Sequence, residues 1–336
     1  MSLYEDIELL TTQELLRLPP VKWLLHGIIP EEGYVTLYGA PEGGKSFVAL
    51  DWAMSISEGK PWLGRVPVTQ APVIYVAAEG GRGITKRVRA WMRHHQVKDL
   101  PAMYFLLNPL YVRQEGTVEA FIDELESREI WPGLVVLDTL SRSFGGGEEN
   151  TSADMGLFVD RMAELAIGRR MACLVLHHKN ATGSRERGST ALRGAMDAMF
   201  DLDTKRDQDG KITLVAVRND KQKDDTRTPP FYLRPANGTE LLGSLVFEEA
   251  PEPPKKERGA GGPTVMRRID MLTYLGGHPE GLTFSEWMLG CQVPKATFKR
   301  RIHFLIENGD IYREEGKYFV FPANIDLVTN TEASDE

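Results

Sequence analysis

The chain has 336 residues, of which 42% are hydrophobic and 26% are charged. This composition is typical of a globular protein and excludes a chain dominated by disorder, and the length suffices for one large α/β domain plus a small second domain. The formal charge is -8, from 40 basic and 48 acidic residues. A globally basic surface for nucleic acid is therefore excluded, and any such contact has to come from local patches.

Cysteine usage and the N-terminus indicate a cytoplasmic protein. Cys173 and Cys291 lie far apart in unlike contexts, so a disulfide framework is not expected and a reducing cytosol fits. The sequence does not open with a basic segment followed by an apolar core, so a signal peptide is not expected. No apolar run approaches the ~18 residues that would span a bilayer.

The first part of the chain predicts an α/β fold. Residues 1–30 are expected to form a helical lead-in that ends near Leu18-Pro19-Pro20. A large domain follows at residues 31–248, where short apolar runs alternate with amphipathic stretches. The apolar runs predict strands at 34–38, 73–78, 103–107, 134–138, 172–177 and 212–217, and helical spacing predicts helices at 47–57 and 153–168. This alternation predicts a mostly parallel sheet flanked by helices on both faces.

The C-terminal part predicts a second, smaller domain. Residues 249–264, EAPEPPKKERGAGGPT, are dominated by proline, glycine and charge, which is typical of a linker. Residues 265–323 then show helical spacing at 265–275, 283–291 and 294–308, followed by two β-runs around the turn Glu315-Gly316. Three helices and a hairpin predict a winged helix, and residues 324–336 are expected to be a disordered tail.

A phosphate-binding pattern directly follows the first predicted strand. In YGAPEGGKSF, residues 38–47, the pattern G-x-x-x-x-G-K-[ST] is met by Gly39, Gly44, Lys45 and Ser46. Glycines let the backbone curl so that its amides point at phosphate oxygens, and the next helix adds its positive end. Lys45 is expected to bridge the β- and γ-phosphates, while the Ser46 hydroxyl binds Mg²⁺. The expected ATP-binding residues are Gly39, Ala40, Pro41, Glu42, Gly43, Gly44, Lys45, Ser46 and Phe47.

Three more residues at the ends of predicted strands narrow the chemistry. Asp138 ends the buried run LVVLD and is expected to reach the Mg²⁺ ion. Glu79 ends VIYVAAE and could deprotonate the attacking water, although a solvated glutamate is the alternative. His178 ends CLVLHH and could sense the γ-phosphate, although a structural histidine is the alternative. The sequence contains no guanine-reading N-K-x-D, which argues against a GTPase.

Together these pieces resemble the RecA-like core, and in particular the RepA-type hexameric helicase ATPases of plasmids and phages. The resemblance covers roughly residues 20 to 235 and rests on VKWL, YGAPEGGKSF, VIYVAAEGG, LVVLDTLSRSFGGGEENTSADM, LVLHHKN and RGSTALRGAMD. It implies a homo-hexamer or other ring with ATP between subunits, in which Glu79 is the catalytic base, Asp138 holds the metal and His178 is the sensor.

The resemblance also implies basic residues that act on the site of the neighbouring subunit. In VRNDKQKDD, residues 217–225, Lys221 and Lys223 occupy the places of these residues, where related helicases usually have an arginine as the second. Lysine lacks the bidentate fork of arginine, so slower hydrolysis is expected, with Arg218 as an alternative finger. A solvated charged hairpin is the structural alternative.

Single-stranded DNA is the expected partner. In RecA-like rings the loops after the Asp138 and His178 strands face the central channel, and here these are residues 143–153 and 180–190. Lys179, Arg185 and Arg187 suit contact with a phosphate backbone, whereas Phe144 is the one aromatic residue that could stack on a base. Further DNA contacts are expected from Lys295, Lys299 and Arg300 in the winged helix, for which protein docking is the alternative.

The leading interpretation is an ATP-hydrolysing DNA motor of the hexameric helicase type that acts in replication or recombination. One alternative is a RecA-like filament or loader that binds DNA without unwinding it. The other is a regulator in which ATP is a conformational ligand and the winged helix reads a DNA site.

Overall fold

A computed structural model of the chain describes residues 9–79, 81–166, 169–180, 186–237, 243–254 and 268–322. The chain divides into two compact units between Glu252 and Pro253. This boundary falls in the stretch expected as a linker, most of which lies outside the described residues, as do residues 324–336. Within the described ranges, no helix is both long and apolar enough to cross a membrane.

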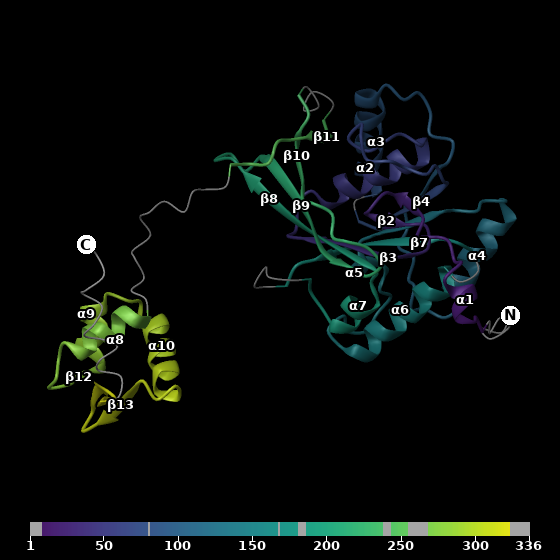
Figure 1. The fold of residues 1–336 in the computed structure, drawn as a ribbon. Coiled ribbons are helices and arrows are strands. Elements are labelled where there is room, and N and C mark those ends of the chain that lie inside the picture. The colour runs from purple at the N-terminus through teal and green to yellow at the C-terminus, as the bar shows by residue number, and fades with distance from the viewer. Residues whose placement is uncertain are drawn as a thin grey trace. The chain divides into compact units, whose positions relative to one another are not determined.

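The first unit is built on one large sheet (Figure 1). Its strands in the described chain follow the order β11-β10-β9-β8-β3-β7-β6-β4-β5. Neighbours from β8 to β5 pair in parallel, and those from β8 to β11 pair antiparallel, so the expected mostly parallel sheet is confirmed. The strands are β3 (Gly33–Gly39), β4 (Val73–Ala77), β5 (Met103–Leu106), β6 (Leu134–Asp138), β7 (Ala172–His178), β8 (Ala198–Arg206), β9 (Ile212–Gln222), β10 (Phe231–Pro235) and β11 (Phe247–Glu249).

Helices cover both faces of this sheet (Figure 1). One hydrophobic core joins the sheet to α2 (Lys45–Glu58) and α3 (Gly81–His95). A second core joins the other face to α4 (Thr117–Ser127), α5 (Leu140–Ser143), α6 (Ser152–Ala166) and α7 (Thr190–Ala195). In α6 the buried residues recur every three to four positions, as an amphipathic helix on a sheet requires: Met155, Phe158, Met162 and Leu165.

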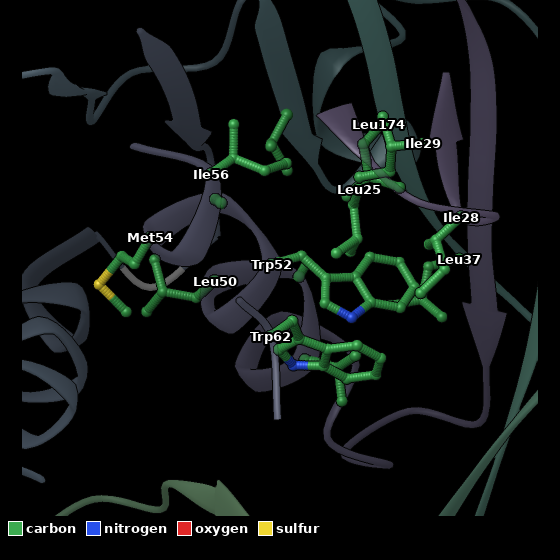
Figure 2. Packing of buried hydrophobic residues seen from close by; sticks show 14 of the residues in the cluster. Leu25, Ile28, Ile29, Leu37, Leu50, Trp52, Met54, Ile56, Trp62 and Leu174 are labelled. Carbon is green, nitrogen blue, oxygen red and sulfur yellow. The ribbon is translucent and has the colours of Figure 1, made fainter. Parts of the chain in front are cut away.

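The helix α2 lies deepest in the first core. Trp52 is fully buried there, and its ring meets Trp62 and Phe200 edge-on, with centroids 5.7 Å apart in each pair (Figure 2). Figure 2 also shows Leu37 and Leu174 from the sheet in the same cluster. Because most residues of α2 from Val48 onward are buried, the helix is fixed firmly relative to the sheet.

A buried carboxylate ties α2 to α3. Asp51 accepts hydrogen bonds from the indole nitrogens of Trp62 at 2.7 Å and Trp91 at 2.6 Å. Burial raises the pKa of Asp51 to about 6, and the two indole bonds oppose this rise. The carboxylate therefore joins α3 and the segment after α2 to the central helix.

The second unit contains α8 (Arg268–Gly276), α9 (Phe284–Cys291) and α10 (Lys295–Glu307) together with β12 (Leu282–Thr283), β13 (Ile311–Glu314) and β14 (Lys317–Val320). The strands pair antiparallel in the order β12-β14-β13. A capping box starts α9, because Thr283 and Glu286 each bond the backbone amide of the other. Trp287 and Phe298 lie fully buried between the helices. Three helices and a hairpin with its turn at Glu315-Gly316 are thus present where the sequence predicts them.

The prediction of a helical lead-in is wrong for residues 23–30. The described part of this segment holds one short helix, α1 (Thr12–Leu15), and then the antiparallel pair β1 (Trp23–Leu25) and β2 (Ile29–Pro30). Gly27, with φ +70°, makes the turn between the two strands. Leu25 and Ile29 are fully buried in the core beside α2, so tertiary burial decides the conformation here.

We predict that replacing Asp51 changes how the stability of the first unit depends on pH. The pKa of Asp51 is raised in the folded chain from 3.8 to about 6, so the folded state holds its proton more tightly than the unfolded state. Stability from this group is therefore present at low pH and is lost as the pH rises through about 6, by about 3 kcal/mol. In urea titrations, the wild type should lose this much relative to Asp51→Asn between pH 4 and pH 7.

The exposed carboxylate of Asp123 on α4 provides the control for this experiment. The Asp123→Asn variant should follow the wild type across the same pH range, because it leaves Asp51 and its two indole partners in place. A wild type that gains stability over Asp51→Asn as the pH rises would contradict the assignment.

Candidate active site

The loop at residues 39–46 connects β3 to α2 and depends on two glycines. Gly44 is the N-cap of α2 with φ +97°, in the left-handed region that favours glycine. A Cβ on Gly39 would lie 2.8 Å from the backbone oxygen of Leu202 on β8. A side chain at either position would therefore disturb the loop.

The start of α2 offers unbonded amides to a ligand. Among the backbone hydrogen bonds of the described chain, those of α2 begin with the Phe47 amide, which donates to the Gly44 oxygen at 3.0 Å. The amides of Gly44, Lys45 and Ser46 precede it and lie at the positive end of the helix. This arrangement suits a phosphate group, as the sequence pattern predicts.

Lys45 lies at the centre of the site. Its amine donates to the oxygens of Gly39 at 3.1 Å and Ala40 at 2.9 Å, and it lies 3.4 Å from Nδ1 of His178. Burial lowers the pKa of Lys45, whereas the charges of Asp138 and Glu79 raise it. The amine is thus held where it can reach a phosphate bound by the loop.

The pairing of the strands brings the remaining predicted residues to the same edge. Gly39 on β3 is the register partner of His178 on β7, and Ala77 on β4 is that of Asp138 on β6. Glu79 follows β4 by two residues and is exposed, and its charge raises the pKa of His178 against the lowering by burial and by Lys45. The structure therefore brings Lys45, Asp138, Glu79 and His178 together.

Asp138 fits the role of a magnesium ligand. It is 3% exposed, and its Oδ1 has no hydrogen-bond partner within the described chain. Oδ2 accepts a hydrogen bond from the hydroxyl of Tyr75 at 2.7 Å. Burial raises the pKa of Asp138, while Tyr75 and the Ser46 hydroxyl lower it by hydrogen bonding. A free carboxylate oxygen beside the Ser46 hydroxyl is a donor set that Mg²⁺ accepts.

The sequence analysis missed two residues of β8 that hold the loop from the side. The Thr204 hydroxyl donates to the backbone oxygen of Gly43 at 2.6 Å, and the Arg206 guanidinium donates to the backbone oxygen of Glu42 at 2.7 Å. Glu42 itself is exposed, with a positive φ of 57°. No motif marks these two residues, because their role depends on β8 lying beside β3 in the sheet.

Tyr75 was also missed, although the sequence carries a signal for it. It lies in the middle of the apolar run VIYVA and is fully buried. A buried tyrosine hydroxyl needs a hydrogen-bond partner, and the carboxylate that ends the adjacent strand is the natural one. That reasoning requires the strand order, which the sequence does not supply.

The residues expected to act on a neighbouring subunit have partners within their own chain. Lys221 donates to the oxygens of Arg193 at 2.6 Å and Gly194 at 3.2 Å, at the end of α7. Lys223 pairs with Asp197 at 3.2 Å and is 61% exposed. Arg218 lies 3.5 Å from Asp203. Their action on a neighbour stays a prediction.

The residues expected to face DNA differ in their surroundings. Lys179 forms an ion pair with Asp201 at 2.6 Å and its side chain is only 12% exposed, so its contact with a phosphate backbone stays a prediction that requires release from Asp201. Arg187 is exposed, whereas Arg185 lies outside the described residues. Phe144 is 3% exposed and stacks on Phe158, so it cannot serve as a platform for bases.

In the second unit, the three expected DNA-contacting residues are exposed along α10. These are Lys295, Lys299 and Arg300. Phe298 and Ile302 point inward from the same helix, as its spacing predicts. Their contact with DNA stays a prediction.

We predict that Tyr75→Phe weakens metal binding at Asp138. The variant loses the hydroxyl that orients the carboxylate, and loss of such a supporting hydrogen bond costs about 10-fold or more in metal affinity. The Mg²⁺ concentration for half-maximal nucleotide hydrolysis should rise by that factor, and Mn²⁺ binding to the nucleotide complex, followed by electron paramagnetic resonance, should weaken equally. Tyr111→Phe, at an exposed tyrosine, is the control. Equal metal affinity in the Tyr75 variant and the control would contradict this role.

A family model and solved structures match parts of this chain. Residues 5–184 match a family model described as an AAA domain, which is more than half of the 336 residues. A solved KaiC-like protein from the hyperthermophilic archaeon Pyrococcus horikoshii OT3 is 13% identical with a TM-score of 0.46, over 68% of this chain and 99% of that chain. The solved RadB recombinase is 15% identical with a TM-score of 0.45, over 67% of this chain and 93% of that chain. The matched region contains the loop 39–46, Glu79 and Asp138, and the chain therefore belongs to the AAA domain family as a P-loop ATPase.

Proposed function

We propose that this ATPase is a motor on single-stranded DNA, of the RepA-type hexameric helicase class. One observation carries the hydrolytic part of the proposal: Lys45, Asp138, Glu79 and His178 come from four different elements and meet at one edge of the sheet. A loop that only connected a strand to a helix would not require these charged and polar groups beside it.

The roles follow from the position and charge of each group. The loop amides and Lys45 hold the β- and γ-phosphates of ATP. Mg²⁺, held by Ser46 and Asp138, would neutralise charge on the phosphates. Glu79 is exposed beside this site, so its carboxylate can orient and deprotonate a water molecule. The neutral His178 ring can hydrogen-bond the γ-phosphate and respond to its loss.

A physical connection between the nucleotide site and the expected DNA loop supports the motor part. The Arg187 amide donates to the His178 oxygen at 2.8 Å, and the Arg187 oxygen lies 2.7 Å from Nε2 of His177. The two expected channel loops also touch, because the Ser189 amide donates to the Glu149 oxygen at 3.1 Å. Movement of the His178 end of β7 would therefore displace Arg187 directly.

The assembly of subunits into a ring is also part of this proposal, and it rests on the resemblance to the RepA-type hexameric helicases. Lys221 and Lys223 lie near the end of β9, on the antiparallel side of the sheet. Release of Lys221 from the α7 oxygens or of Lys223 from Asp197 would free a cation for a neighbouring site. We also propose that the second unit is a winged helix, because it has three helices and a hairpin.

We predict that Lys45→Ala abolishes hydrolysis. Loss of one preorganised charge at the transferring phosphate lowers the turnover by about 100- to 1,000-fold. The measurement is phosphate release with excess ATP, accompanied by a circular dichroism spectrum that should match that of the wild type. Lys98→Ala, at an exposed lysine after α3, is the control and should keep the wild-type rate. Wild-type turnover in Lys45→Ala would refute the site.

We further predict that Arg187→Ala weakens binding of single-stranded DNA. One lost phosphate contact should reduce the slope of log affinity against log salt by about 0.7. The measurement is fluorescence anisotropy of labelled oligo-dT at several salt concentrations. Arg128→Ala, which removes an exposed arginine at the end of α4, should leave the slope unchanged. If the salt dependence of affinity were unchanged in both variants, Arg187 would not contact the DNA.

A forked-duplex assay separates the motor from a loader. ATP-dependent strand separation supports the helicase class. Hydrolysis that is stimulated by single strands, without strand separation, supports a RecA-like loader instead.

A further inference from the structure

The second unit carries an open groove with a volume of about 790 Å³ between α10 and the β13–β14 hairpin. It lies on the face from which the sequence predicts DNA contact, because Lys299 and Arg300 both line it. The two ends of the groove are made by Ala296 and Ile306, about three turns apart on α10. Its dimensions suit a short segment of chain.

The floor of the groove is apolar and rigid. Phe284, Ile302 and Tyr318 line it, and each is anchored in the core of the unit. The Phe284 ring packs edge-on against Phe298 at 5.2 Å, and the Tyr318 ring lies 5.7 Å from that of Trp287. Ile302 and Tyr318 are only 4% and 7% exposed, so the more accessible apolar side chains of the groove are those of Phe284 and Ile306.

Ile306 extends the apolar floor to the outer surface. Its side chain is 42% exposed, although it belongs to a helix with a well-formed buried face. An apolar surface of this kind beside a groove is typical of a binding site.

The rim of the groove is basic. Lys299 and Arg300 are exposed on α10, and Arg313 reaches over from β13 with its guanidinium 5.6 Å from the Tyr318 ring centroid. His303, also on the rim, lies 3.2 Å from Glu307 on the same helix. None of the described residues that line the groove is acidic.

We propose that this groove is a docking site for an acidic peptide segment of another protein, one that carries bulky apolar side chains. Carboxylates of the peptide would pair with Lys299, Arg300 and Arg313, while its apolar side chains would cover the floor. Aromatic and arginine side chains around an apolar centre are the composition of protein interfaces. The charge of the rim excludes a basic peptide.

The floor favours a peptide over DNA. A nucleic-acid backbone is held by exposed cations, and it has no apolar group that would fill an apolar groove. Duplex DNA on this face would leave Phe284, Ile302 and Ile306 covered by charged phosphates, at a cost in desolvation of the phosphates. The basic rim alone would suit either partner, so the apolar floor is the feature that favours a peptide over DNA.

The test uses the full chain and two pools of fluorescein-labelled peptides of about ten residues. In one pool, aspartate or glutamate alternates with leucine, isoleucine or phenylalanine. In the other, alanine replaces every bulky apolar residue. We expect anisotropy to report binding of the first pool and at least about 10-fold weaker binding of the second.

Variants locate the peptide on the chain. Arg300→Glu and Ile306→Ala should each weaken binding of the first pool by about 10-fold, through the rim and the floor respectively. Two controls lie outside the groove: Lys295→Glu changes a charge on the same helix, and Leu289→Ala removes an apolar side chain that is 79% exposed on α9. Both controls should bind like the wild type.

Three results would overturn the proposal. Equal binding of the two pools would show that charge alone is read. Equal effects of the groove variants and the controls would place the peptide elsewhere. Displacement of the peptide by short duplex DNA, with duplex binding that weakens more than peptide binding in Arg300→Glu, would make this face a nucleic-acid surface.

Discussion

The in-register pairing of the parallel strands β3, β7, β6 and β4 is the constraint on which the site depends. Parallel strands end at the same edge of a sheet, and the helices that follow them begin there. Gly39 therefore lies beside His178, and Asp138 lies beside Ala77, two residues before Glu79. A slip of one residue in any of these pairs would turn a functional side chain to the opposite face. The buried apolar runs of these strands prevent such a slip.

The charges at this edge are unfavourable to bury and are balanced against one another. Burial lowers the pKa of Lys45 and raises that of Asp138, so burial disfavours the charged form of each group. Glu79 acts on both: its charge favours the cation of Lys45 and disfavours the anion of Asp138. A triphosphate with its magnesium ion would place opposite charges beside each group. The charges of the bound ligand would therefore compensate these buried groups better than the neighbouring side chains do.

Most of the α/β fold could be predicted from the sequence because its central strands are continuous apolar runs. Two of the strands that were missed are β8, where antiparallel pairing begins, and β10 beyond it, and in both of them charged residues such as Asp203 and Arg234 interrupt the apolar pattern. Lys45 was found because a motif of fixed spacing marks it, and Asp138 and His178 were found because each ends a continuous apolar run. Tyr75, Thr204 and Arg206 were not, since their partners are distant in sequence. The ion pair of Lys179 with Asp201 was missed for the same reason, because Lys179 directly follows β7 and Asp201 lies on β8, with β3 between these strands.

The two histidines at the end of β7 connect the phosphate site at Lys45 with the segment at Arg187. Successive side chains of a strand point to opposite faces, so the imidazole rings of His177 and His178 have different surroundings. His178 contacts the Lys45 amine, whereas Nε2 of His177 lies 2.7 Å from the Arg187 oxygen. The Arg187 amide in turn donates to the backbone oxygen of His178. A change at the phosphate site that moved His178 by a fraction of an ångström would act on Arg187 through both bonds at once.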